Sequence, residues 1–142
     1  LNTMKDKYFM QKAIEDAKLN RRYFGAVIVK NGRIISKSGK KSEKDILSHA
    51  ETQAVLKACK KLGVKSLENC TLYSTCEPCP MCFYLAWITR IKKIFYGATL
   101  EDSMKFGFSE INITASLLNK KSGSRIKLNN FMRKECLELF RN

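Results

Sequence analysis

The sequence has one histidine, one tryptophan and two prolines in 142 residues. It contains no apolar run approaching about 20 residues, the length that spans a membrane. Its first residues, Leu1 to Lys12, lack the apolar core of a secretory signal. These absences argue against a membrane protein and against a secreted one. The hydrophobic share of 44% and the charged share of 28% are typical of a globular protein, and residues 1–142 are expected to form a single domain.

Acidic residues are scarce as well, with 13 Asp and Glu against 27 Lys and Arg, which gives a formal net charge of +14. The excess lies at the two ends, because residues 1–45 carry 12 basic and 5 acidic side chains and residues 115–142 carry 7 and 2. A basic surface attracts polynucleotides, but only seven of the basic residues are Arg and few aromatic residues lie among them. A solvated Lys-rich surface explains the charge equally well, so nucleic acid is an alternative partner.

Three of the six cysteines, Cys76, Cys79 and Cys82, are too close together for a disulfide framework. Reduced thiols that bind a metal explain this spacing better, and such thiols belong to a reducing compartment. We therefore expect a cytoplasmic protein.

The hydrophobic pattern predicts strands and helices that alternate after a first hairpin. The hairpin is indicated by Asn31 and Gly32, a pair that suits a two-residue type I′ turn. The predicted helices are residues 3–19, 49–62, 80–89, 112–118 and 129–140, and the predicted strands are residues 25–30, 33–36, 71–75, 94–98 and 125–128. A polar loop is expected at residues 37–48. This order predicts an α/β fold, a mixed sheet with helices on both faces.

The sole histidine, His49, is followed two residues later by Glu51 and thirty residues later by Cys79, which opens a Pro-Cys-x-x-Cys motif ending at Cys82. His49 begins one predicted helix, and the two cysteines flank the start of another. Because residues three apart lie on one face of a helix, both sulfurs can reach one ion. Three nitrogen and sulfur ligands with an open fourth position are typical of a catalytic zinc, whose bound water has a pKa lowered to about 7.

Glu51 is the predicted proton shuttle, because a shared ion fixes His49 and leaves the carboxylate two residues away free beside the water. Backbone N–H groups at the helix starts near Ala50 and Cys79 are candidates to stabilise developing negative charge. The pattern His-x-Glu … Pro-Cys-x-x-Cys is the signature of zinc deaminases that act on nucleobases.

Two alternatives concern Cys76. A structural zinc site would need a fourth ligand, and Cys76 is the main candidate for it. The run of cysteines at positions 76, 79 and 82 also resembles the start of an iron–sulfur motif, but Ala86 stands where the fourth cysteine would be. Otherwise Cys76 is a small residue at the end of a buried strand.

The sequence resembles the cytidine deaminase-like superfamily and, within it, the guanine deaminases. The resembling segments are residues 48–51, 56–59, 70–82 and 95–98, together with Asp102 and residues 107–110. The resemblance implies a three-layer αβα fold with a central mixed five-stranded sheet, a Zn²⁺ cofactor and a homodimer. The tRNA adenosine deaminases share the metal residues but tend to have Leu where this chain has Cys76.

The sequence departs from the family pattern at three points. It has no Asn shortly after the second strand, no Pro before Phe24, and a shifted aromatic pair that leaves Trp87 beside Ile88. Phe24 and Trp87 are candidates to stack on a base, and each is also a candidate for the core. The resemblance places Glu110 near the base, where a carboxylate suits the N1–H and amino group of guanine.

We therefore expect zinc-dependent hydrolytic deamination of a nucleobase, with guanine as the favoured substrate. Deamination of adenosine in tRNA and deamination of cytosine or cytidine are alternatives. A non-catalytic binding module in which zinc only stabilises the fold is a further alternative.

Overall fold

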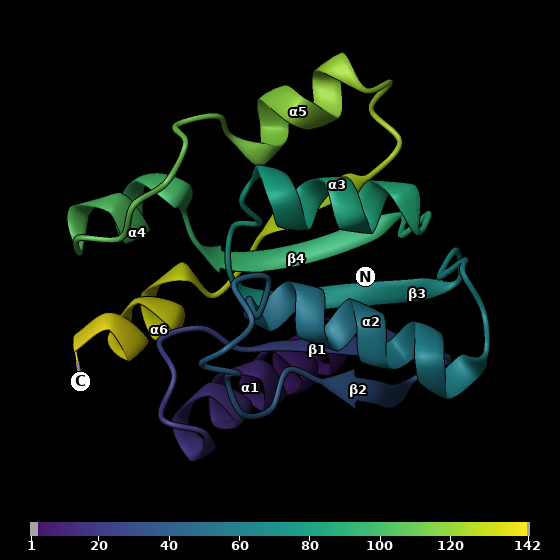
Figure 1. Cartoon of the computed structure of the whole chain (residues 1–142), viewed down its shortest axis with the longest axis horizontal. Helices are drawn as coiled ribbons and strands as arrows, with labels where there is room; N and C mark the ends of the chain where they lie inside the picture. Colours follow the sequence, from purple (N-terminus) through teal and green to yellow (C-terminus); the bar gives the residue numbers. More distant parts are fainter. Residues whose placement is uncertain (1–2, 142) are drawn as a thin grey trace.

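A five-stranded sheet in the order β2-β1-β3-β4-β5 organises the chain, in a computed structural model that describes residues 3–141 (Figure 1). The strands are β1 (Ala26–Lys30), β2 (Arg33–Lys37), β3 (Cys70–Cys76), β4 (Lys93–Ala98) and β5 (Lys127–Asn130). β1 runs antiparallel to both β2 and β3, whereas β3, β4 and β5 are parallel. The predicted mixed sheet is confirmed.

The turn between β1 and β2 has the backbone that its two residues favour. Asn31 and Gly32 have φ values of 50° and 75°, the left-handed conformation that a type I′ turn needs at both central positions. The hairpin contains a bulge between Ile28 and Val29, where the register shifts.

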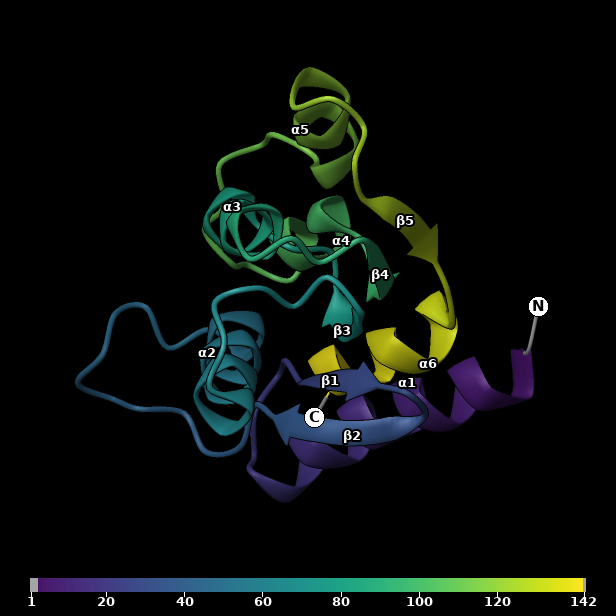
Figure 2. The ribbon, with the colours of Figure 1, turned by 90° about the vertical axis from the view of Figure 1, so that its right-hand side faces the viewer.

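Helices cover both faces of the sheet, which confirms the three-layer αβα fold (Figures 1 and 2). One face packs against α2 (Ala50–Leu62), α3 (Pro80–Ile88) and α5 (Ala115–Lys121). The other face packs against α1 (Thr3–Leu19), α6 (Arg133–Leu137) and the 3₁₀ helix η1 (Glu138–Arg141). The described residues contain no helix with the length and apolar character of a membrane span.

Alternation along the strands builds the two cores. Ile28 of β1 is paired with Leu72 of β3, which is paired with Ile94 of β4, and all three face the core beneath α2 and α3. Their chain neighbours Tyr73 and Phe95 face the other core, where their rings stack with centroids 4.9 Å apart. Successive side chains of a strand point to opposite faces, so each strand supplies both cores.

The second half of the chain differs from the sequence-based expectation. A short helix, α4 (Leu100–Lys105), was not predicted, α5 begins at Ala115 instead of residue 112, and the fifth strand covers residues 127–130 instead of 125–128. The predicted helix at residues 129–140 was wrong at its start, because β5 continues through two asparagines whose side chains bond to β4. Asn130 Nδ2 donates to Gly97 O at 2.7 Å, and Asn129 Nδ2 donates to Ile94 O at 3.3 Å.

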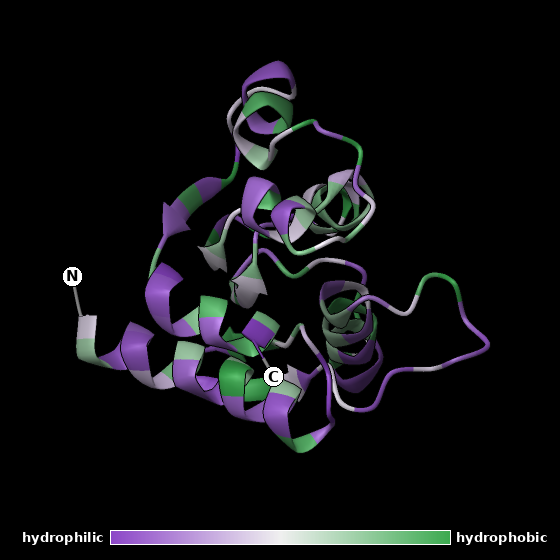
Figure 3. Cartoon of the chain, turned by 90° about the vertical axis from the view of Figure 1, so that its left-hand side faces the viewer, coloured by the Kyte–Doolittle hydropathy of each residue, from purple (hydrophilic) through white to green (hydrophobic). Residues whose placement is uncertain are grey.

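The long loop at residues 38–49 between β2 and α2 extends away from the body of the molecule (Figures 2 and 3). It carries two exposed apolar side chains, Ile46 and Leu47, with 91% and 53% of their surface accessible. Gly39 N donates to the Asp16 carboxylate and joins the start of the loop to α1, whereas Ser42 N donates to Ser48 Oγ within the loop itself.

An ion pair joins α4 to α6. Arg133 donates two hydrogen bonds to the buried carboxylate of Asp102, Nε at 2.8 Å and Nη2 at 2.7 Å. These bonds, together with the N–H of Thr99, lower the pKa of Asp102 to about 2. Arg133 itself is half-exposed, so solvent screens part of the attraction.

We expect Asp102→Asn to lower the unfolding midpoint at pH 7 by about 3–6 °C. The folded pKa lies below the unfolded value, so the carboxylate stabilises the fold above about pH 4 and loses this effect as the pH falls toward 2. Thermal unfolding followed by circular dichroism at pH 7, 4 and 2.5 measures the difference, which should shrink on acidification. Glu101→Gln removes an exposed ion pair on the same helix and is the control. An effect of Asp102→Asn that is independent of pH would contradict this explanation.

Candidate functional site

The site lies at one edge of the sheet, where the carboxyl ends of β3 and β4 meet the beginning of β1. Because β1 is antiparallel to β3, Ala26 pairs with Ser74, and the residues before β1 come close to those after β3. β4 is parallel to β3, so Ala98 pairs with Cys76 and Thr99 leaves the sheet at the same edge. In α/β sheets, ligands bind outside the carboxyl ends of the strands.

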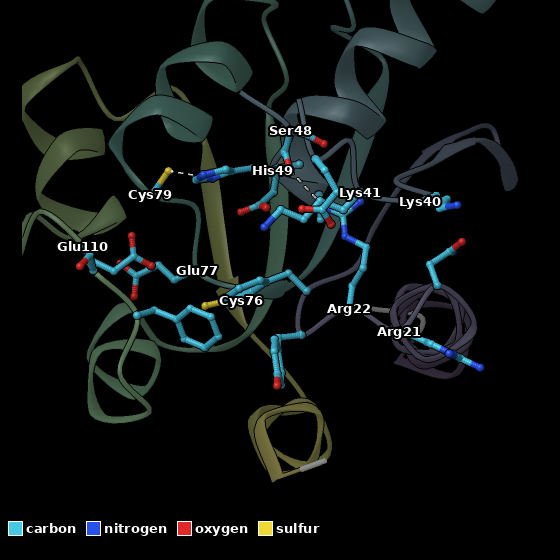
Figure 4. A pocket seen from close by; sticks show the side chains of 18 residues that line it. Arg21, Arg22, Lys40, Lys41, Ser48, His49, Cys76, Glu77, Cys79 and Glu110 are labelled. Atoms are coloured by element: carbon cyan, nitrogen blue, oxygen red, sulfur yellow. Dashed lines mark hydrogen bonds between the residues drawn. The ribbon is translucent and has the colours of Figure 1, made fainter. Parts of the chain in front are cut away.

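The predicted metal ligands are brought together at the starts of two helices (Figure 4). His49 precedes the first residue of α2 with an extended backbone, and Cys79 occupies the same position before α3. Cys82 is in the first turn of α3 and is buried. Within the described part of the chain, His49, Cys79 and Cys82 are the group of side chains arranged to hold a metal ion, with ligand atoms within 4.8 Å of one another.

The spacing of the three ligand atoms fits zinc. Nδ1 of His49 lies 3.6 Å from Sγ of Cys79 and 3.5 Å from Sγ of Cys82. A tetrahedral zinc with Zn–S of about 2.3 Å and Zn–N of about 2.0 Å places such atoms about 3.6 Å apart. Two thiolates and one neutral imidazole match the preferred donors of this ion and leave its fourth position open.

The two thiols differ in acidity. The hydrogen bond from Cys82 and, after the opposing effect of burial, the bond with His49 lower the pKa of Cys79 to about 4. The pKa of Cys82 is raised by its bond to Cys79 and by burial. The pair therefore shares one proton, and Cys79 is the thiolate; this proton is released when a metal binds both sulfurs.

Cys76 is not part of this cluster. It ends β3 in a buried position, and its thiol lies 3.8 Å from Thr99 O. Burial and the nearby carboxylates raise its pKa well above the ordinary value. The geometry thus favours three protein ligands over a closed site with four, and it agrees with the interpretation of Cys76 as a small residue at the end of a buried strand.

Glu51 lies in the first turn of α2, two residues after His49, and only 6% of its surface is exposed. Burial, followed by the negative charge of Cys79, raises its pKa to about 7. A carboxyl group with a pKa near neutrality can both accept and return a proton, as a general acid–base catalyst must.

A cavity of about 530 Å³ opens beside the metal ligands, a volume within the usual range for small-molecule sites. Its lining includes four residues expected near a substrate or in proton transfer, namely Phe24, Ala50, Glu51 and Glu110. Trp87 is not among the lining residues. Its ring lies 4.1 Å from the guanidinium carbon of Arg125 and stacks on Tyr84, and Nε1 lies 3.4 Å from Ser122 O. In a single chain, therefore, Trp87 packs against α5 and its connection to β5.

Glu110 is half-buried and lies on the same side of the cavity as Cys79 (Figure 4). Its Oε2 lies 2.9 Å from Oγ of the fully buried Ser103. Burial raises the pKa of Glu110, and the bond to Ser103 opposes this effect.

Several cavity residues were missed by sequence reasoning, and three of them make contacts that bear on the site. The ring of Phe108 packs edge-on against Phe24 with centroids 4.9 Å apart, and it was signalled only by its place in the segment 107–110. Glu77 is a buried carboxylate next to the cysteine motif. Arg22 is the third, and its guanidinium donates to Gly39 O at 2.8 Å, to Ser48 O at 3.3 Å and to Gln53 Oε1.

Comparison with known proteins matches residues 3–98 to the family described as the cytidine and deoxycytidylate deaminase zinc-binding region. The guanine deaminase of Bacillus subtilis is 45% identical over 89 residues, which cover 61% of this chain and 57% of that protein. Its solved structure superposes with a TM-score of 0.67 at 31% identity, over 85% of this chain and 94% of that one. This chain thus spans less than two thirds of the Bacillus protein in the sequence comparison.

Two further relatives bear on the site and the fold. The tRNA-specific adenosine deaminase of Aquifex aeolicus is 43% identical over 104 residues, which cover 67% of each chain. The guanine deaminase of Nitrosomonas europaea superposes with a TM-score of 0.82 over 99% of this chain and 83% of that one, at 19% identity. The latter likeness concerns the fold.

Proposed function

This chain belongs to the cytidine and deoxycytidylate deaminase zinc-binding family, and we propose that it deaminates a purine base by hydrolysis, converting guanine to xanthine and ammonia. The observation that carries the proposal is the convergence on one cavity of the His49, Cys79 and Cys82 triad, the buried carboxyl of Glu51 and the carboxylate of Glu110. The metal-binding triad and Glu51 carry out the reaction, and Glu110 selects the base.

Zinc held by the triad supplies Lewis acidity and lowers the pKa of a water molecule to about 7. Glu51 accepts a proton from water and delivers it to the ring nitrogen adjacent to the carbon under attack. It then accepts the second proton of the attacking water oxygen and passes it to the departing amine, so that this oxygen replaces the amino group and ammonia leaves. The N–H of Ala50 lies at the first position of α2, where a helix leaves its amides without internal partners, and it serves as a donor to the developing negative charge.

Glu110 favours guanine among the purines. Guanine presents N1–H and its amino group side by side, and a carboxylate accepts both as a charge-assisted pair. Adenine and cytosine instead present a ring nitrogen acceptor next to the amino group, which a carboxylate repels. Phe24 and Phe108 line the same cavity and offer apolar ring surface to a flat base.

A second candidate, deamination of adenosine in tRNA, is favoured by the basic rim of the cavity. Arg21, Lys40 and Lys41 belong to its lining, and Figure 4 places Arg21 and Lys40 on the side away from Cys79. These cations can contact phosphates, and the Aquifex relative carries that activity in its name. Against this candidate, Arg22 is engaged with the loop at residues 38–49, and Lys120 and Lys121 lie on α5, outside the cavity lining.

One screen tests the proposal. Ammonia release is measured from guanine, guanosine, adenine, adenosine, cytosine and cytidine, beside inosine formation in a tRNA anticodon stem-loop, each at low and high salt. We expect guanine to react fastest with little response to salt, whereas polynucleotide turnover would fall steeply as salt rises. In Glu110→Gln the amide presents a donor to the donors of guanine, so kcat/KM for guanine should fall about 10- to 150-fold, the value of a hydrogen bond to a charged group.

Each other outcome of the screen has a defined meaning. If the protein deaminated the tRNA stem-loop strongly and did not deaminate guanine, the tRNA candidate would replace the guanine candidate. The absence of an Asn after β2 would then be the first feature of the sequence to examine. Ammonia from none of the substrates would favour the non-catalytic module, in which zinc only stabilises the fold.

Three further features belong to the proposal. We propose a homodimer, supported by exposed apolar side chains on the outer helices, Leu56 on α2 and Tyr84 and Ile88 on α3. A cytoplasmic location is supported by six cysteines that are all free thiols. Residues 1–142 are treated as one domain, which the single five-stranded sheet supports.

A further inference from the structure

Glu110 lies on a stretch of chain without helix or strand. Residues 107–114 connect α4 to α5 and carry both Phe108 and Glu110. No sheet ladder fixes this stretch, and the N–H of Phe108 returns to α4, donating to Ser103 O at 3.1 Å. The direction of the Glu110 carboxylate therefore depends on how α4 and α5 are held.

One buried carboxylate holds the starts of both helices. Oε1 of Glu77 accepts the N–H of Leu100, the first residue of α4, at 3.0 Å. Oε2 accepts the N–H of Ala115, the first residue of α5, at 2.7 Å. Amides in the first turn of a helix have no internal partner, so Glu77 satisfies one such amide in each helix. Residues 100–115 are thereby attached at both ends to a single side chain.

Glu77 is itself fixed to the metal-binding loop. Its N–H donates to Ala98 O at 2.8 Å, which extends the pairing of β3 with β4 by one residue. The next two residues are Pro78 and the metal ligand Cys79, and Glu77 is 7% exposed. Its carboxylate thus relates the position of the 100–115 segment to the position of the metal ligands.

The last contact in the chain reaches the cavity. Ser103 is fully buried on α4, and its Oγ lies 3.0 Å from Leu100 O and 2.9 Å from Glu110 Oε2. A shift at the start of α4 therefore moves Ser103 and, with it, the Glu110 carboxylate. Figure 4 shows Glu77 and Glu110 next to each other on the side of the cavity below Cys79.

We propose that Glu77 is a positioning residue of the deaminase site, which sets the placement of Glu110 relative to the metal ligands by bonding to the first amides of α4 and α5. The inference rests on the proposed role of Glu110 in binding the substrate. Glu77 acts through Glu110 and Ser103 and takes no part in proton transfer.

The test compares Glu77→Gln with Glu101→Gln, an exposed glutamate on α4 that lies outside the cavity lining. In Glu77→Gln the side-chain NH₂ replaces one carboxylate oxygen and faces the N–H of Leu100 or of Ala115. Two donors then face each other, so one of the two hydrogen bonds is lost while the shape of the side chain is nearly unchanged. We expect Glu77→Gln to keep one zinc per chain and to raise KM by about 10- to 100-fold, since a misaligned Glu110 loses most of a hydrogen bond to a charged group, which contributes about that much to binding. Glu101→Gln should match the wild type. Ser103→Ala is the milder second variant, and it should raise KM in the same direction.

A double-mutant cycle identifies the route. If Glu77 acts through Glu110, Glu77→Gln should have little further effect in the Glu110→Gln background. A purely structural role would instead lower kcat through a smaller active fraction, at unchanged KM. The fold-changes of the two single variants would then multiply in the double variant, which means that their free energies add. Additive effects or an unchanged KM would overturn the proposal.

The test also separates this inference from the proposed substrate. The cycle is run on whichever base the wild type deaminates, so failure of guanine alone does not decide it. Hydrogen–deuterium exchange supplies a readout that needs no turnover: Glu77→Gln should increase exchange in residues 107–114 and leave α2 and β3 unchanged. If residues 107–114 exchanged equally fast in Glu77→Gln, in Glu101→Gln and in the wild type, the proposal would be overturned, even for a chain without measurable activity.

Discussion

Glu51→Gln should lower turnover by at least about 10²-fold and leave the zinc content at one ion per chain, since a positioned proton-transfer group contributes about 10²–10⁴-fold. The glutamine has nearly the same shape and fills the same buried position in the first turn of α2. The glutamine amide cannot accept a proton near neutral pH. The carboxyl group of Glu51 can, because its pKa is raised to about 7, mainly by burial. Initial rates of ammonia release and elemental analysis of the same sample provide the measurement.

The matched control for Glu51→Gln is Glu68→Gln, an exposed glutamate that pairs with Lys92 and does not line the cavity. It makes the same chemical change and should leave rate and zinc content unaltered. A Glu51→Gln variant that kept more than about a tenth of the wild-type rate would rule out Glu51 as the proton shuttle. A loss of less than about tenfold is smaller than the contribution of a positioned proton-transfer group. Loss of zinc in this variant would assign it a role in holding the metal.

The metal site could be predicted because its ligands occupy local positions that sequence patterns describe. His49 and Cys79 each precede the first residue of a helix, and Cys82 follows within one turn. The short spacing fixes which side chains share a helix end. The two helices follow β2 and β3, which both run antiparallel to the β1 strand between them and therefore end at the same edge of the sheet. Alternating strands and helices likewise sufficed for the mixed sheet and its two helical layers.

The residues that sequence reasoning missed act through contacts between distant segments. Glu77 bonds to amides 23 and 38 residues away, and Arg22 bonds to acceptors on the loop at residues 38–49 and on α2. No periodicity indicates such contacts. The helix α4 offered a signal, because Thr99 and Asp102 form a capping box, but six residues are too few for a helical period to be read.

The boundaries of β5 depended on tertiary structure in the same way. Asn129 and Asn130 are poor strand formers, yet their side-chain amides bond to carbonyls of β4 and extend the strand. Trp87 was named as a candidate for both the base and the core, and in a single chain it packs beside Arg125 and Tyr84. Local propensity does not distinguish these environments.

Removal of one metal ligand should have the second large effect. Cys82→Ser replaces a buried thiol within reach of His49 Nδ1 by a hydroxyl, which is a poor zinc ligand. We expect the zinc content to fall from one ion per chain to nearly none and turnover to fall with it. The unfolding midpoint should fall as well, because a ligand that binds only the native state stabilises it by mass action.

Cys76→Ser is the matched control, since it makes the same substitution at a buried cysteine outside the ligand cluster. It should retain one zinc and most of the turnover. A chelator added to the wild type should reproduce the loss seen in Cys82→Ser, and added Zn²⁺ should restore activity to the wild type but not to the variant. If Cys76→Ser lost its metal, the site would have four protein ligands and a structural role. If elemental analysis of the wild-type protein found iron and labile sulfide, the zinc interpretation would be wrong. The thiolates at positions 76, 79 and 82 would then be ligands of an iron–sulfur cluster.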